Sequence, residues 1–192
     1  MILIVDNHSK NVPLIKAALT RLNASYIVRG QKALFRDVER KRIKGVIMSG
    51  GRPVLDKEIH LKDIRADISC LINYDVPILG ICEGHEIIGV ACGGELRALR
   101  IPARSTDNKV RLLTKRGIFR GLPSTIPVYE HHSKYLRDVP ATLQVAATST
   151  KDRIEAVFHK HKPIFGLQFH PERMGDTGLK IFFNFLALCK KK

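Results

Sequence analysis

The chain has 192 residues, of which 44% are hydrophobic, and it carries a formal net charge of +15 at pH 7. That length is enough to bury a full core without disulfides or a structural metal, so we expect one domain over residues 1–192. No apolar run approaches the roughly 20 residues that cross a bilayer, and MILIVDN at the start has no basic export-signal region, which predicts a cytoplasmic protein with no membrane partner.

The first half of the chain alternates apolar runs with helical patterns. Strands are predicted at residues 1–5, 25–28, 45–48 and 77–81, and helices at residues 11–22, 32–44, 59–74 and 84–92. Strand and helix in turn are typical of parallel sheets covered on both faces. We therefore predict an α/β fold with a doubly wound, mostly parallel sheet and flanking helices.

The second half, after Gly93 and Gly94, is rich in short strand patterns. These are predicted at residues 109–113, 126–129, 143–147, 154–159 and 164–169, followed by a closing helix at residues 177–188. This half is expected to add antiparallel strands to the sheet.

The four cysteines form no CxxC pair, which argues against a zinc site and a disulfide framework. Cys70, Cys92 and Cys189 are predicted to be packing residues, because free cysteine behaves as a small hydrophobe.

The positive charge raises the possibility of an anionic partner. Basic residues gather at 36–44, at 97–104 and in the terminal lysines, with almost no aromatic residues among them on which bases could stack. These segments are interpreted as solvated faces, and nucleic acid is not the expected partner.

Cys82 stands in PILGICEGHE, between a predicted strand and a predicted helix. Gly-x-Cys-x-Gly has the spacing of the Gly-x-Ser-x-Gly nucleophile elbow, which presents a reactive side chain above a sheet. Free N–H groups at a helix start favour a thiolate, and the N–H of Glu83 is a candidate oxyanion donor. On local sequence alone, a small core residue is an equal alternative.

A nucleophilic cysteine needs a base and a group that orients the base. In PIFGLQFHPER, His170 ends a predicted strand and Glu172 follows two residues later, so the carboxylate can turn back to the imidazole. Gly50 and Gly51 end another strand and allow close approach of a backbone N–H. Since open α/β sheets bind ligands at the carboxyl ends of their strands, these pieces predict one site.

Taken together, these stretches resemble class I glutamine amidotransferases of the triad type. The resemblance runs from VDN near the start through SGG at 49–51 and PILGICEGHE to GLQFHPE. It implies a flavodoxin-like fold. It also implies that Cys82 attacks the carboxamide of glutamine, while His170, held by Glu172, acts as base and then protonates the departing ammonia.

The same resemblance implies roles for further residues. Oxyanion N–H groups are expected from Gly51 and Glu83, and substrate contacts from Gly50, Glu86, His132 and Ser133. Glu86 stands where the family commonly has glutamine. Its negative charge is expected to raise the pKa of the Cys82 thiol and to keep the enzyme nearly silent until a partner docks.

Such domains hand ammonia to a synthetase, and the sequence has no GxxxxGK[ST] phosphate loop. Mg-ATP is therefore expected on a separate ATP-pyrophosphatase subunit, with no cofactor in this chain. The segments around 117–136 and 155–172 are similar to the separate glutaminase subunit of archaeal-type GMP synthases, which implies GMP synthesis from XMP. Alternatives are the amidotransferase subunit of anthranilate or aminodeoxychorismate synthase, and a non-catalytic nucleic-acid-binding or regulatory protein.

Histidines offer one other interpretation. His131 with His132, and His159 with His161, have spacings seen in metal sites. No cysteine or carboxylate completes a ligand set in the sequence, so no metal is expected, and His159 and His161 are predicted to lie in an exposed hairpin turn.

Overall fold

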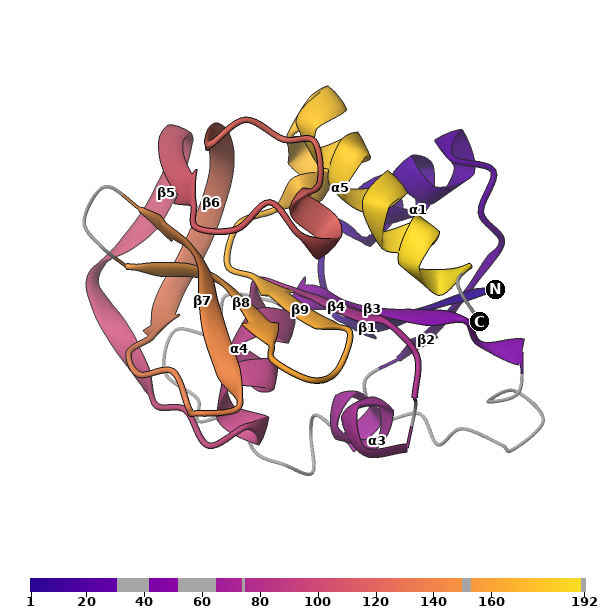
Figure 1. Ribbon diagram of the computed structural model, residues 1–192, viewed down its shortest axis with the longest axis horizontal. Helices are drawn as coiled ribbons and strands as arrows, with labels where there is room; N and C mark the ends of the chain where they lie inside the picture. The colour runs from indigo at the N-terminus through magenta and orange to yellow at the C-terminus, as the bar shows by residue number, and fades with distance from the viewer. Residues whose placement is uncertain (31–41, 52–64, 74, 150–152, 191–192) are drawn as a thin grey trace.

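The computed structural model describes residues 1–30, 42–51, 65–73, 75–149 and 153–190, and a nine-stranded sheet runs through them (Figure 1). The strand order is β2-β1-β3-β4-β9-β8-β7-β5-β6. The strands are β1 (Ile2–Asn7), β2 (Tyr26–Gly30), β3 (Gly45–Gly51), β4 (Ile78–Ile81), β5 (Leu96–Leu112), β6 (Thr125–Leu136), β7 (Leu143–Ser149), β8 (Ile154–His159) and β9 (Ile164–Leu167). The helices are α1 (Val12–Arg21), α3 (Arg65–Asn73), α4 (Glu83–Ala91) and α5 (Gly175–Cys189), with the 3₁₀ turns η1 (Gly117–Phe119) and η2 (Pro171–Arg173).

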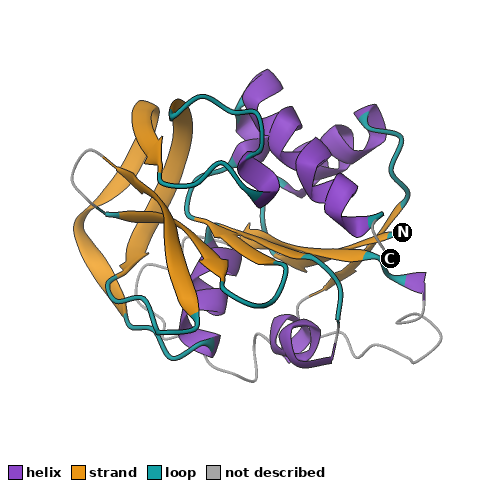
Figure 2. Ribbon diagram, in the orientation of Figure 1, coloured by secondary structure: helices purple, strands orange, loops and turns teal. Residues whose placement is uncertain are grey.

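One half of the sheet is parallel. β1 pairs with β2 and β3, β3 pairs with β4, and β4 pairs with β9, in each case in parallel. Helices α1 and α5 cover one face of this half, and α3 and α4 lie on the other (Figures 1 and 2). The predicted doubly wound, mostly parallel arrangement is therefore confirmed for this half of the sheet.

The other half is antiparallel, as expected, but its strands are longer than the sequence predicts. β5 has 17 residues and β6 has 12, where the sequence predicts only short segments at 109–113 and 126–129. The register of their pairing shifts between Ala98 and Ala103 and again between Ser105 and Asn108. Such bulges interrupt the alternation of apolar and polar residues on which strand prediction relies, so the extra length leaves no pattern in the sequence.

Apolar side chains fill both sides of the sheet. On the side of α1 and α5, Ile15, Leu19, Phe182 and Phe185 are fully buried. On the side of α4, Ile87 and Ile88 pack with β-strand residues in a second cluster. Burial against both faces explains why the parallel strands form continuous apolar runs in the sequence.

The cysteine predictions hold in part. Cys70 and Cys189 are buried in the two clusters, and Cys92 is half-buried against the second. The predicted helix at 32–44 lies almost wholly outside the described residues, and the helix at 59–74 is described only as α3. Within the described ranges, no helix is both long and apolar enough to cross a membrane.

Candidate active site

Cys82 occupies the sharp turn between β4 and α4. Its backbone has φ 52° and ψ −104°, a positive φ that a residue with a side chain rarely adopts. A strained backbone of this kind costs of the order of 1–3 kcal/mol and is characteristic of functional positions. The Cys82 N–H donates to the carbonyl of Leu167 at 2.7 Å, which ties the turn to β9.

The two flanking glycines allow β3, β4 and α4 to approach closely. A Cβ on Gly84 would lie 2.5 Å from the carbonyl oxygen of Met48 in β3, and a Cβ on Gly80 would collide with the carbonyl of Gly84. The glycines around Cys82 therefore serve the packing of the turn as well as its backbone conformation.

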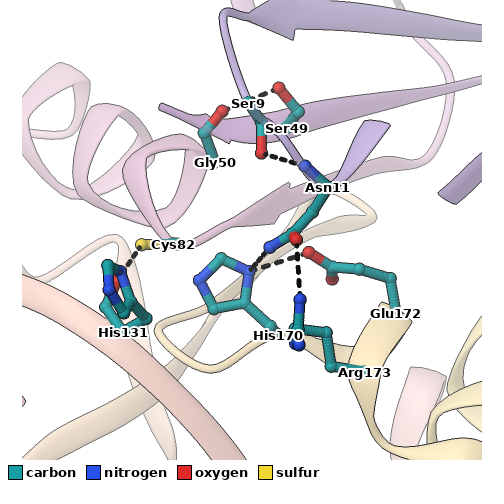
Figure 3. A network of polar contacts seen from close by, with 9 residues as sticks. All are labelled: Ser9, Asn11, Ser49, Gly50, Cys82, His131, His170, Glu172 and Arg173. Atoms are coloured by element: carbon teal, nitrogen blue, oxygen red, sulfur yellow. Dashed lines mark hydrogen bonds and ion pairs between the residues drawn. The ribbon is translucent and has the colours of Figure 1, made fainter. Parts of the chain in front are cut away.

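His170 and Glu172 form a buried pair beside this turn. His170 Nδ1 lies 2.7 Å from Glu172 Oε1, because η2 begins directly after His170 and brings the carboxylate back to the ring. With Nδ1–H donating to Glu172, the lone pair remains on Nε2, which is buried and has no protein partner among the described residues. In Figure 3 the imidazole lies between Cys82 and Glu172.

Gly50, near the end of β3, lies close to both His170 and Cys82. A Cβ built there would lie 3.2 Å from His170 Cε1 and 3.4 Å from Cys82 Cβ. The structure thus brings the ends of β3, β4 and β9 together around Cys82, at the carboxyl edge where open α/β sheets bind ligands.

Three residues that the sequence analysis does not predict as site residues surround His170. Asn11 Nδ2 lies 3.2 Å from His170 Nδ1, and Arg173 donates to Asn11 Oδ1 at 3.2 Å (Figure 3). The Arg173 guanidinium also lies 4.3 Å from the centre of the Tyr129 ring, which meets the imidazole edge to face. Nothing in the sequence marks Asn11 or Tyr129, since both reach the site only through the tertiary fold.

The environment of the thiol favours its protonated form. Burial raises the pKa of Cys82 well above its ordinary value, and the negative charges of Glu86, Glu172 and Glu83 raise it further, although a hydrogen bond from the Glu83 N–H acts in the opposite direction. The thiol faces the carbonyl of His131 at 3.7 Å. At neutral pH the sulfur is therefore held as a thiol, and attack requires a base.

Two glutamates of α4 carry much of this negative potential. Burial, followed by the charges of Glu86 and Asp67, raises the pKa of Glu83 to about 8, and Lys134 partly offsets this. Burial raises the pKa of Glu86 to about 7 against the opposing hydrogen bond that Gln168 Nε2 donates at 3.2 Å. A carboxyl at either position thus stays partly protonated near neutral pH.

The remaining predicted site residues lie around this centre. Gly51 packs directly against the Glu83 carboxylate, which fills the space that a side chain would need. The His132 imidazole belongs to a buried cluster with Glu130 and Glu155, and Ser133 is half-buried beside it on β6. Their oxyanion and substrate roles stay predictions.

The predicted exposed turn is confirmed for the other histidine pair. His159 Nδ1 accepts the backbone N–H groups of His161 and Lys162 at 3.1 and 3.0 Å, and His161 is exposed. This occupies one nitrogen of His159 in a local turn and fits the hairpin interpretation.

Comparisons with known proteins give the same family along almost the whole chain. The model of the family described as "Glutamine amidotransferase class-I" matches residues 3–189. A subunit of the glutamine-hydrolyzing GMP synthase of Methanosphaera stadtmanae is 32% identical over 190 residues, covering 98% of each chain. The corresponding subunit of Methanococcus aeolicus is 34% identical over 191 residues, covering 98% of this chain and 97% of the relative.

Solved structures of other proteins share the fold of this chain. A Thermoplasma acidophilum protein described as a "putative gmp synthase subunit a protein" superposes with a TM-score of 0.87 at 30% identity, over 98% of this chain and 92% of the other. A glutamine amidotransferase from Thermotoga maritima shares the fold with a TM-score of 0.74 at 20% identity, over 100% of this chain and 85% of the other.

Proposed function

The chain belongs to the class I glutamine amidotransferase family, and from that premise we propose that it hydrolyses glutamine to glutamate and ammonia and supplies the ammonia to a separate synthetase subunit that converts XMP to GMP. The observation that carries the proposal is the Cys82 thiol at the strained turn beside the His170–Glu172 pair.

In the first step, His170 Nε2 removes the thiol proton as the sulfur attacks the carboxamide carbon of glutamine. The negative charge that develops on the carboxamide oxygen requires N–H donors, for which Gly51 and Glu83 are the candidates. Glu172 stabilises the imidazolium because it accepts the Nδ1–H. The C–N bond then breaks, the imidazolium gives its proton to the departing ammonia, and a thioester with Cys82 remains.

In the second step, water attacks the thioester carbonyl. His170 Nε2 takes a proton from the water, the C–S bond breaks, and the sulfur regains its proton. Glutamate leaves and the thiol is restored. Each turnover therefore releases one glutamate and one ammonia.

The acceptor chemistry is placed on another polypeptide. The relatives named as one subunit of GMP synthase are covered over nearly their whole length by this chain, which supports a separate partner subunit. We expect that partner to be an ATP pyrophosphatase that binds Mg-ATP and XMP. Free cysteines at all four positions fit a reducing, cytoplasmic setting.

The charges around Cys82 support tight control of the reaction. Glu83 and Glu86 disfavour the thiolate in the isolated chain, so a partner that displaces or neutralises these carboxylates would activate the thiol. The proposal therefore includes weak glutaminase activity until the synthetase subunit docks.

The test measures glutamate released from glutamine by the purified chain, alone and with the ATP-pyrophosphatase subunit, XMP and Mg-ATP. We expect a large rise in glutamate with the full mixture and matching formation of GMP. Glutamate without GMP would point to another acceptor, such as chorismate for anthranilate synthesis. High activity of the isolated chain would contradict control by docking.

The variant Cys82→Ala distinguishes a catalytic role of Cys82 from a role in assembly of the complex. Cys82→Ala should abolish glutamine-dependent GMP synthesis by the complex but preserve synthesis from added ammonium. Loss of both activities would show that Cys82 is needed for assembly and would count against its role as the nucleophile.

A further inference from the structure

Three buried side chains outside the proposed triad converge, and each leaves one polar atom without a hydrogen-bond partner among the described residues. Glu130 and His132 lie on β6 and Glu155 on β8, and only 3%, 6% and 2% of their surfaces are exposed. Glu130 Oε1, His132 Nε2 and Glu155 Oε2 each have no hydrogen-bond partner among the described residues. One ligand atom from each residue lies within 4.8 Å of those of the other two.

The other polar atoms of the cluster are already engaged. His132 Nδ1 lies 2.6 Å from the carbonyl of Lys134, so Nδ1–H donates and the lone pair is on Nε2. Asn108 Nδ2 donates to Glu130 Oε2 at 2.5 Å, which leaves Oε1 for the cluster. Ser149 supplies a side-chain hydrogen bond to Glu155.

This arrangement matches the outer shell of a metal site. A histidine ligand usually donates its other ring N–H to a carbonyl or carboxylate, and ligating carboxylates are themselves held by hydrogen bonds. Two ionised carboxylates and a neutral imidazole would together present two negative charges. Burying such charges without a counter-ion is strongly unfavourable.

We propose that Glu130, His132 and Glu155 bind one divalent transition-metal cation of the Zn²⁺ class. Imidazole nitrogen and carboxylate oxygen are both ligands of Zn²⁺, with bonds of about 2.0–2.2 Å. A tetrahedral ion spaces such ligand atoms by about 3.4 Å, so side-chain rotations that close the cluster by roughly an ångström bring all three ligands to the ion, and the fourth position is left for water. Two carboxylates neutralise the charge of the ion.

The site would be structural, since it joins strands that are not neighbours in the sheet. β7 and β5 separate β8 from β6, so a shared ion would cross-link the curved antiparallel half. It would also fix β6 next to the residue whose carbonyl faces the Cys82 thiol. The sequence marks only the histidine pair that includes His132, because Glu155 is brought to His132 only by the fold.

Proton sharing is the competing explanation. Burial raises the pKa of Glu155 to about 8 and also raises the pKa of Glu130, so protonated carboxyls could occupy the cluster. Arg153 opposes both shifts through its charge. The two explanations differ in whether the purified chain takes up an ion.

The experiment titrates Zn²⁺ into the full chain after treatment with EDTA, in the Cys82→Ala background so that the thiol cannot bind the ion. Isothermal calorimetry should give one Zn²⁺ per chain, and saturation should raise Tm. Glu155→Gln and Glu130→Gln should each weaken binding by at least about 100-fold and remove the rise in Tm. Co²⁺ in place of Zn²⁺ should give the visible spectrum of tetrahedral nitrogen and oxygen ligation.

Two controls locate the ion. Glu95→Gln changes a carboxylate in surface ion pairs, and His161→Ala changes the exposed histidine turn, so neither should alter the affinity for Zn²⁺. The glutamine variants keep the shape of the side chain, and unchanged circular dichroism would show that they fold. Zn²⁺ uptake that is equal in Glu155→Gln and in the parent, or no uptake by the parent, would overturn the proposal in favour of shared protons.

Discussion

The thiol of Cys82 depends on charges that single substitutions can remove. Its sulfur lies at the start of α4, where the N–H of Glu83 favours the thiolate, yet the carboxylates of Glu83 and Glu86 have the opposite effect. Burial raises the pKa of the thiol most, and the helix terminus and its acidic side chains then act on it in opposite directions.

Glu86→Gln should lower the pKa of the thiol. The amide oxygen can still accept from Gln168, so the change removes charge and keeps the hydrogen bond. We expect iodoacetamide to alkylate Cys82 several-fold faster at pH 7 in the variant, and glutaminase activity of the isolated chain to rise. Alkylation is followed by peptide mass spectrometry, which distinguishes Cys82 from the other cysteines. Glu95→Gln is the matched control, and an equal rise there would rule out a local effect.

His170→Ala should lower kcat/KM by about 10²–10⁴-fold or more, because the base is lost.

Glu172→Ala should lower kcat/KM less than His170→Ala does, since the imidazole remains. Asn11 Nδ2 then faces Nδ1 alone and favours the tautomer with its lone pair on Nδ1 instead of Nε2. Adding Asn11→Ala to Glu172→Ala should therefore restore part of the activity. A further loss in the double variant would show that Asn11 positions the ring. The kcat/KM of each of the three variants is measured in the complex with the synthetase subunit.

At the scale of elements, the contact between α4 and the sheet determines where the turn lies. Gly84 touches the backbone of Met48 in β3, and Gly80 touches the carbonyl of Gly84. These contacts leave no room for a methyl group. The glycines of the elbow motif are thus required by packing against β3 as well as by the turn.

Gly84→Ala should destabilise the protein by about 1–3 kcal/mol, because overpacking forces α4 off β3. The displacement should also reduce activity, since Cys82 moves with the helix. Urea unfolding measures the first effect and glutamate release the second. Gly30→Ala is the control, because a Cβ there meets nothing within 4 Å and should leave stability unchanged or slightly higher.

Some helices and strands are predicted accurately from the sequence, whereas several contacts between them are not. β8 is predicted with its observed bounds, and α4 within one residue, because their patterns are regular and end in turn residues. The predicted triad residues meet because each follows a strand that ends at the same edge of the sheet. Asn11, Tyr129 and the Glu130–Glu155 contact escape prediction, since they depend on how α1, β6 and β8 curve toward one another, and no local pattern encodes that.

At the scale of the whole molecule, several buried carboxyls make stability depend on pH in an unusual direction. Burial raises the pKa of Asp67 and Glu86 to about 7 and that of Glu83 to about 8, against ordinary values of 3.8 and 4.5. The folded state then keeps protons that the unfolded chain has released. Stability from these groups is present below about pH 4 and is lost as the pH rises through 7 to 8.

The free energy of unfolding should accordingly fall by of the order of 3 kcal/mol between pH 6.5 and 8.5. His85 and His132, whose pKa values burial lowers to about 3 and about 4, act in the opposite direction but only below their ordinary value of 6.5. Urea unfolding at pH 6.5, 7.5 and 8.5 tests this. Replacing Glu83 and Glu86 by glutamine should flatten the dependence, and a slope unchanged by that pair would assign it to other groups.

The place of β9 in the sheet has a consequence for biosynthesis. β9 follows the other described strands in the sequence, yet it inserts beside β4 in the parallel half and carries the chain to His170. A nascent chain that has made β1 to β4 already has Cys82 but still lacks His170, the proposed base that removes the thiol proton. The order of synthesis therefore delays hydrolysis of cellular glutamine until the strands of the antiparallel half and His170 have been made.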